Sequence, residues 1–272
     1  MSDLHHEKHL EAYVVEKLET AGWLVGTSDA YDADRAMYSE DLEAWLRATQ
    51  PQKWERLQAM NGENTLKIVA DRLETALEKQ GTIEVLRQGF SVAGAGHLDL
   101  SEAAPEDQRN EAVLHRYAAN RLRVVPQLKY HPERELAIDL GLFLNGLPLA
   151  TVELKTDFTQ SARRAREQYC RDRQPVDAVT KRKHPLLTFK RGAVVHFAMS
   201  DSEIWMTTRL AGEDTFFLPF NKGNDGRAGN APREDGEYPV AYFWEEICQP
   251  EAFLRIFHNF VYVEKKNVVD LK

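Results

Sequence analysis

The sequence is poor in cysteine, in long apolar runs and in excess positive charge. Its 272 residues include two cysteines, Cys170 and Cys248, which match neither a zinc-binding spacing nor a disulfide framework. No apolar run approaches the roughly 18 residues of a membrane span, and the first residues lack a signal-peptide core. These absences predict a protein of the reducing cytoplasm with no membrane partner.

The charge and the missing motifs exclude several classes of nucleic-acid enzyme. Thirty-five basic and 43 acidic residues give a net charge of −8, so any contact with DNA must be local. The chain has no GxxxxGK(S/T) segment and therefore no P-loop ATP site. It also has no helix-turn-helix, zinc-finger or heptad pattern, so sequence specificity would have to come from a partner.

Residues 136–155, LAIDLGLFLNGLPLATVELK, predict a β-hairpin. The two halves are rich in Leu, Ile, Val, Phe and Thr, and the Asn-Gly pair at 145–146 is a strong signal for a tight turn. Three charged residues interrupt the apolar pattern: Asp139 on the first strand, and Glu153 and Lys155 on the second. Glu153 and Lys155 are two residues apart, so we expect them on one face of the strand.

The convergence of these charged residues predicts a metal site. Burying charge in a sheet is costly unless the charges meet each other or a metal ion. Asp139 and Glu153 suit Mg²⁺, with Mn²⁺ as a substitute, because hard cations take oxygen ligands, retain waters and engage phosphate oxygens. Lys155 would orient or help deprotonate an attacking water, or stabilise the charge that develops on phosphorus.

This site sets a condition on the register of the hairpin. With a regular two-residue turn, Asp139 and Glu153 would point to opposite faces of the sheet. A three-residue loop or a β-bulge would place the two acids opposite each other. We predict such an irregularity, with Gly141 and Pro148 as its markers.

The sequence around these residues resembles that of a known family. Asp139, thirteen intervening residues and Glu153-Leu154-Lys155 are similar to the D…(D/E)xK signature of the PD-(D/E)XK nuclease superfamily. Four sequence segments are more specific than this signature: DLGLFLNGLPLATVELK, VVHFAMSDSEIWMTTRLAGEDTFFLPFNKG, AGN and YFWEEI. Together they resemble the amino-terminal nuclease region of the R (restriction and motor) subunit of type I restriction–modification enzymes, over residues 11–263.

The resemblance implies both a fold and an activity. The fold is α/β, a restriction-endonuclease-like core with a central mixed β-sheet flanked by helices. The activity is that of a type I site-specific deoxyribonuclease, a Mg²⁺-dependent endonuclease that hydrolyses double-stranded DNA without sequence specificity of its own. The implied partners are the methyltransferase (M) and specificity (S) subunits. ATP would act only through a motor region that follows in the family and is missing here.

The resemblance adds two residues to the candidate site. Gln168 resembles the glutamine that opens a QxxxY motif after the ExK strand, although Asp172 stands at the tyrosine position. Glu11 corresponds to an active-site glutamate on the first helix. For Glu11, a solvated helix glutamate remains the alternative.

A helix predicted from Thr159 to Arg173 carries most of the local positive charge. Its narrow apolar stripe would pack on the sheet, while its arginines would line the remaining sides. Arg163, Arg164 and Arg166 are the candidates for contacts with DNA phosphates. An ordinary charged surface helix is the alternative.

We expect one endonuclease domain over residues 1–263. Its parts would be a helical segment at about 1–120, a catalytic sheet core at about 121–210 and a closing segment at 211–263. Residues 264–272 read as a linker toward the missing ATP-dependent translocase. Two other functions remain open: a catalytically silent module that docks the motor on the methyltransferase core, and a stand-alone repair nuclease of the same superfamily.

Overall fold

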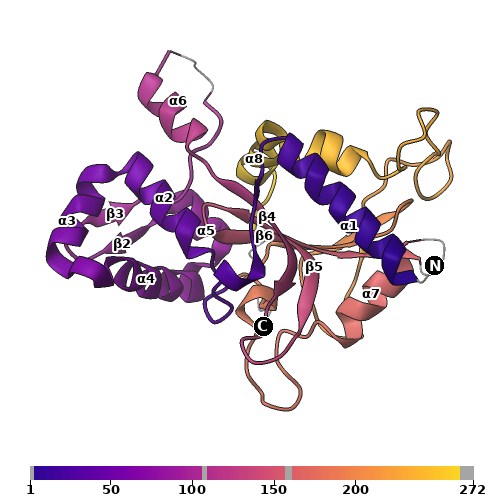
Figure 1. Cartoon of the computed structure of the whole chain (residues 1–272), viewed down its shortest axis with the longest axis horizontal. Helices are drawn as coiled ribbons and strands as arrows, with labels where there is room; N and C mark the ends of the chain where they lie inside the picture. The colour runs from indigo at the N-terminus through magenta and orange to yellow at the C-terminus, as the bar shows by residue number, and fades with distance from the viewer. Residues whose placement is uncertain (1–2, 106–108, 157–160, 264–272) are drawn as a thin grey trace, which may run out of the picture.

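A seven-stranded mixed β-sheet forms the centre of the protein (Figure 1). The computed structural model describes residues 3–105, 109–156 and 161–263, with side chains from residue 7 onward. In sheet order the strands are β1 (Leu24–Val25), β4 (Leu122–Lys129), β5 (Ala137–Leu144), β6 (Leu147–Leu154), β7 (Val195–Met199), β8 (Ile204–Thr207) and β9 (Leu218–Pro219). The pairs β1–β4 and β6–β7 are parallel and the other neighbours antiparallel.

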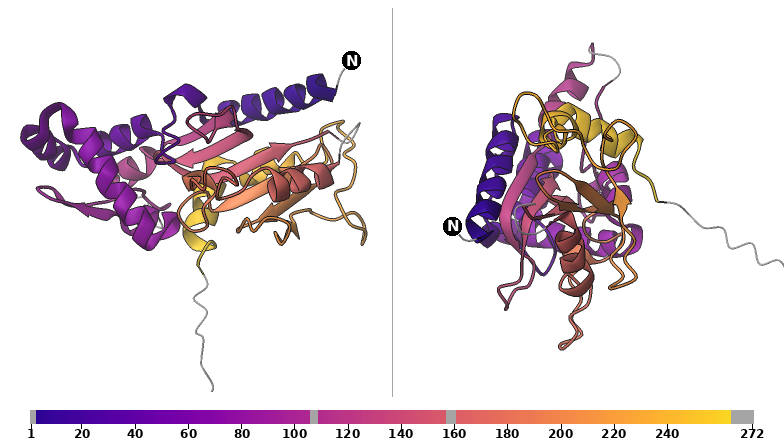
Figure 2. Two further views of the ribbon diagram at one scale, coloured as in Figure 1. Left: turned by 90° about the horizontal axis from the view of Figure 1, so that it is seen from below. Right: turned by 90° about the vertical axis from the view of Figure 1, so that its right-hand side faces the viewer.

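Helices cover both faces of this sheet, which confirms the predicted α/β fold (Figure 2). Helix α1 (Asp3–Thr20) buries apolar residues at helical spacing in the core on one face, namely Leu10, Val14 and Leu18. Helix α7 (Ala162–Arg171) packs Ala165 and Tyr169 on the opposite face. The closing segment adds a π-helical turn (Phe243–Ile247) and α8 (Pro250–Asn259) to the core on the α1 side.

A helical lobe extends from one end of the sheet, at the left of Figure 1. It contains α2 (Ser39–Thr49), α3 (Pro51–Asn61), α4 (Thr65–Gln80), α5 (Thr82–Gln88) and the hairpin of β2 (Phe90–Val92) and β3 (Gly96–Leu98), with α6 (Glu111–Ala118) projecting beside it. The sheet extends past the expected limits of about 121–210, because β1 comes from the first segment and β9 from the closing one. The expected linker at 264–272 lies outside the described residues. None of the described helices is long and apolar enough to cross a membrane.

The predicted hairpin is present and turns at Asn145 and Gly146. Both residues have positive φ, 49° and 90°, as a type I′ turn requires. The Asn145 side chain is fully buried, accepts the Arg121 N–H at 2.7 Å and donates to Leu100 O at 2.9 Å. Its amide therefore fixes the turn to the chain that enters β4 and to the lobe.

A β-bulge in β6 confirms the predicted irregularity. Phe143 pairs with Pro148, whereas the preceding residue, Leu142, pairs with Ala150. Leu149 is thus an extra residue in β6, next to the predicted marker Pro148. Beyond the bulge the strands pair as far as Leu140 and Val152, and the same register continued by one residue sets Asp139 opposite Glu153.

Gly141, the other predicted marker, lies in a regular part of the hairpin and pairs with Thr151. A Cβ atom at Gly141 would lie 2.4 Å from Leu128 Cδ2 and 2.9 Å from Phe143 Cε2. The prediction that Gly141 marks the bulge is therefore wrong. Glycine is needed here because neighbouring side chains fill the space of a Cβ.

Candidate active site

Asp139 lies near the start of β5, where three elements meet. Its Oδ2 accepts the Leu154 N–H at 2.7 Å, which holds the carboxylate against the end of β6. The Gln127 amide reaches Asp139 Oδ1 at 3.4 Å and also donates to Glu11 Oε2. Gln127 has a φ of +47°, an irregularity directly after Pro126 that aims its side chain between the two acids. The structure thus brings Glu11 of α1 beside Asp139, through a residue that the sequence did not single out.

Glu11 is half-buried rather than freely solvated. Burial raises the pKa of its carboxyl to about 7, and the nearby Asp139 adds to the rise, while the Gln127 hydrogen bond opposes it. A carboxyl that titrates near neutrality beside a second carboxylate is typical of functional sites. This placement agrees with the role that the family resemblance assigns to Glu11.

Glu153 is fully buried on the α7 side of β6. Arg173 Nε donates to its Oε1 at 2.5 Å. The Gln168 amide can hydrogen-bond to both of its neighbours in one orientation only. Its nitrogen then donates to Glu153 Oε2 at 3.2 Å and its oxygen accepts from Arg173 Nη2 at 2.7 Å. Burial and then Asp139 raise the pKa of Glu153 to about 8, and Arg173 and Lys155 oppose this rise.

Arg173 is a site residue that the sequence analysis missed. It was grouped with the surface arginines of a helix ending at Arg173, but α7 ends at Arg171 and Arg173 is buried. Its backbone N–H donates to Gln168 O at 3.2 Å, and its guanidinium lies over the Tyr130 ring, 5.8 Å from the centroid. A fully buried glutamate such as Glu153 needs a cationic partner. The predicted helix offers five arginines, so the sequence does not show which of them pairs with Glu153.

Lys155 lies one residue beyond β6 and reaches toward α1. Its Nζ is 3.3 Å from Glu7 Oε2 and donates to Leu154 O at 2.9 Å. Its side chain keeps 11% of its surface exposed. The ammonium is thus held at the mouth of the site, close enough to Glu153 to influence that carboxyl.

The oxygens of this site fit a hard divalent cation. Among the described residues, Asp139 Oδ1 has only the long contact with Gln127 and each Glu153 oxygen has a single donor, so lone pairs remain on both acids. Glu11, Asp139 and Glu153 do not bring three carboxylate oxygens within 4.8 Å of one another. An ion held by two carboxylates that keeps several waters, as Mg²⁺ does, matches this open arrangement.

The sequence also matches a family model. The model described as the type I restriction enzyme R protein N terminus covers residues 5–215. The chain belongs to this family. The matched residues include all the predicted site residues, from Glu11 to Gln168. No curated protein matches the chain.

In this member of the R-protein family, the tyrosine position of the QxxxY motif is an exposed aspartate, Asp172. A different tyrosine, Tyr169, faces the sheet from α7, and its hydroxyl lies 2.8 Å from Thr151 Oγ1. Thr151 also contacts His196 Nδ1 at 2.7 Å, so the buried His196 is a satisfied core histidine. These contacts fasten α7, and with it Gln168, to β6 and β7.

The three arginines proposed for DNA contacts have different surroundings on α7. Arg163 pairs with Glu167 at 3.0 Å, one turn along the helix. Arg166 stacks over the Trp205 ring, 4.1 Å from its centroid. Arg164 is exposed and forms no ion pair with a residue in the described ranges. Arg164 is therefore the most available of the three for a phosphate.

Proposed function

We propose that this chain is a Mg²⁺-dependent endonuclease domain that hydrolyses DNA phosphodiesters without sequence specificity of its own. One observation supports the proposal: the bulge in β6 sets a register, paired as far as Leu140 and Val152, which brings Asp139 opposite Glu153 when it is continued by one residue. Lys155 follows two residues farther along. A register irregularity that aligns the half-buried Asp139 with the fully buried Glu153 serves a site better than a core. Family membership supports the same activity.

The residues around the two acids have distinct roles in this proposal. Mg²⁺ bound by Asp139 and Glu153 would polarise a phosphate oxygen and lower the pKa of a coordinated water. Gln127 and the Leu154 N–H orient Asp139. Arg173 and Gln168 orient Glu153 in the same way. Lys155 positions the attacking water or neutralises charge on the phosphate, and Glu11 completes the acidic set.

The wider setting follows from the R-protein family. We propose that the M and S subunits of the complete enzyme supply site recognition, because the chain has no base-reading motif. ATP would act through a motor region of the R subunit, since these 272 residues contain no P-loop. The enzyme would work in the cytoplasm, where its DNA substrate lies.

Millimolar Mg²⁺ is expected to stabilise this chain through the proposed site. An ion that binds only the folded state at ten times its Kd adds about 1.4 kcal/mol, which raises Tm by a few degrees in a chain of this size. Asp139→Ala should abolish that response, because one of two carboxylate ligands is gone. Differential scanning calorimetry with and without Mg²⁺ measures both effects.

Asp172→Ala is the matched control for Asp139→Ala. It also removes one negative charge near α7, but Asp172 is exposed and is not a proposed ligand. Its Mg²⁺ response should equal that of the wild type. A wild-type chain without any response, or an Asp139→Ala chain with the full response, would contradict the metal assignment.

Binding of this chain to duplex DNA is expected to be weak, independent of sequence and sensitive to salt. Each phosphate contact contributes roughly 0.9 to the slope of log K against log salt concentration. Arg164→Ala should lower that slope by about one and weaken all sequences equally. Fluorescence anisotropy over a salt series measures the slope.

Arg255→Ala tests whether this effect is local. Arg255 is an exposed arginine on α8, on the other side of the sheet, and pairs with Glu251. Its loss changes the net charge by the same amount but should leave the slope unchanged. Equal slopes for the wild type and both variants would show that α7 does not contact DNA.

A further inference from the structure

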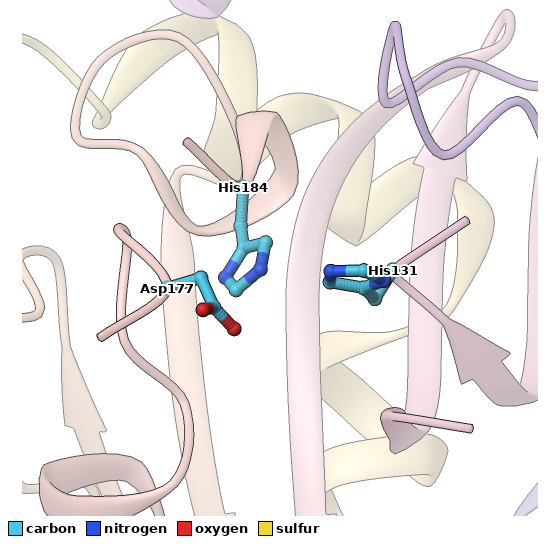
Figure 3. Close-up of side chains that lie close together, drawn as sticks. All are labelled: His131, Asp177 and His184. Carbon is cyan, nitrogen blue, oxygen red and sulfur yellow. The ribbon is translucent and has the colours of Figure 1, made fainter. Parts of the chain in front are cut away.

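A second group of potential metal ligands is separate from the candidate active site, and Figure 3 shows its three side chains. His131 follows β4, while Asp177 and His184 belong to the segment between α7 and β7. All three are buried, with 4%, 5% and 3% of their surfaces exposed. One ligand atom from each lies within 4.8 Å of the other two, the only such group of three among the described residues.

His184 already has the tautomer that a metal ligand needs. Its Nδ1 lies 2.7 Å from the Gln174 carbonyl oxygen, which can only accept, so Nδ1 carries the proton. Nε2 then presents a lone pair, and it is buried without a hydrogen-bond partner in the described part of the chain. Metal-bound histidines in proteins commonly donate their other ring N–H to a backbone carbonyl in this way.

Asp177 is likewise held in place by other groups. Its Oδ1 accepts the Val179 N–H at 2.9 Å and the Thr180 N–H at 2.7 Å. Its Oδ2 accepts from the Arg134 guanidinium, which leaves one lone-pair site on that oxygen. The carboxylate is therefore oriented, ionised and able to take one more cationic partner.

His131 is the third group, and its proton is on the other nitrogen. Its Nδ1 accepts the N–H groups of Glu133 and Arg134, each at 3.1 Å. A neutral His131 ring thus carries its proton on Nε2, which is buried and has no hydrogen-bond partner among the residues that the structure describes. Figure 3 shows the ring edge-on, with one nitrogen directed at His184. Residues 132–135, the turn that supplies the two amides, are exposed. A ligand role for Nε2 requires this turn to move, so that its two N–H groups leave Nδ1 free to take up a proton.

We propose that His131, Asp177 and His184 bind one Zn²⁺ ion, with water as the fourth ligand. Two imidazoles and one carboxylate are a common ligand set for Zn²⁺. Zn–N and Zn–O bonds of about 2.0–2.2 Å place tetrahedral donors roughly 3.4 Å apart, so the three side chains close inward on the ion. On binding, the His131 proton leaves Nε2 and a proton is taken up at Nδ1, with no net release.

The ion, with three protein ligands and one water, would leave an open position and would also link two segments next to the candidate catalytic residues. It would tie the end of β4 to the segment 174–184, which already places the His184 ring 5.1 Å from the Tyr130 ring. Tyr130 in turn lies under the Arg173 guanidinium that holds Glu153. Zinc would therefore hold in place the segment beneath Arg173, the partner of Glu153. This inference does not depend on the nuclease proposal.

The test begins with the metal-free chain and Zn²⁺ alone. Isothermal titration calorimetry should show one Zn²⁺ per chain, and substitution with Co²⁺ should give the intense visible absorption of a four-coordinate site. His184→Ala and Asp177→Asn should each weaken Zn²⁺ binding at least about 100-fold. Asp139→Ala should bind as the wild type does, which separates this site from the candidate active site.

The histidine tautomers give a readout that needs no variant. Long-range ¹H–¹⁵N spectra of the wild type should show His131 changing from the Nε2–H to the Nδ1–H form as Zn²⁺ is added, while His184 stays Nδ1–H. Failure of the wild type to take up Zn²⁺, or undiminished binding by folded His184→Ala, overturns the proposal. The cluster would then be a pocket in which water bridges the two histidines.

Discussion

Lys155→Met in the complete R-subunit enzyme is expected to reduce DNA cleavage by about 10²–10⁴-fold, the usual contribution of a positioned acid–base group. ATP hydrolysis should not change, because the chain contains no ATP site. Tm should also stay nearly constant: methionine keeps the apolar stem, and the lost ion pair with Glu7 is partly exposed. Single-turnover cleavage assays and an ATPase assay measure the two activities separately.

Lys129→Met provides the comparison. Lys129 ends β4, which is separated from β6 by β5, and it is exposed and pairs with Glu135. Its replacement removes the same charge from the same sheet and should leave cleavage intact. Wild-type cleavage by Lys155→Met would remove the lysine from the chemistry and favour the docking module over the nuclease.

The hairpin shows how far local sequence determines this fold. The Asn-Gly pair at 145–146 specifies a turn whose two positive φ angles few other residues accept. The demand that Asp139 and Glu153 share a site then predicted a bulge, and the bulge is present at Leu149. Pro148 was a useful marker because proline lacks the N–H that a regular ladder needs. Gly141 misled the prediction because its constraint comes from the side chains of Leu128 on β4 and Phe143 on β5 and not from the bulge.

The surroundings of the acids were less predictable, because they depend on tertiary contacts between distant segments. Gln127 has no motif, and its role arises from a backbone irregularity that aims it at Glu11 and Asp139. The sequence gives no sign that Arg173 differs from the surface arginines. In the structure α7 ends at Arg171, and Arg173 points inward to Glu153. A charge pattern along a helix gives the faces of that helix but says nothing about residues just past its end.

The histidine cluster could not be predicted from spacing at all. His131, Asp177 and His184 come from two separate loops, and none lies at a spacing typical of zinc ligands. The tautomers of the two histidines depend on hydrogen bonds to the Gln174 carbonyl and to backbone amides, and such backbone groups leave no mark in the sequence. Only burial and the unpaired Nε2 atoms distinguish these histidines from ordinary core residues.

Asp41→Ala is expected to be the most destabilising single substitution on the helical lobe, with a loss of about 3–5 kcal/mol in the free energy of unfolding. Asp41 is fully buried in the first turn of α2. It accepts from Arg121 Nε at 2.7 Å and from Arg123 Nε and Nη2 at 2.5 and 2.7 Å. The substitution removes both close carboxylate contacts of the buried Arg123 guanidinium. The exposed Glu40 at 3.7 Å, the Val25 carbonyl and the Tyr38 ring remain. Urea unfolding measures the loss.

Glu43→Ala, on the same helix, shows why burial decides the size of this effect. Glu43 pairs with Arg47 at 2.7 Å, but both side chains are partly exposed. Water replaces the lost partner there, so its removal should cost no more than about 0.5 kcal/mol. The Asp41 pair also joins α2 to β4, the strand that carries Gln127 at its other end. Similar losses for Asp41→Ala and Glu43→Ala would mean that water reaches Arg123, and that the lobe is held on the sheet by its apolar contacts alone.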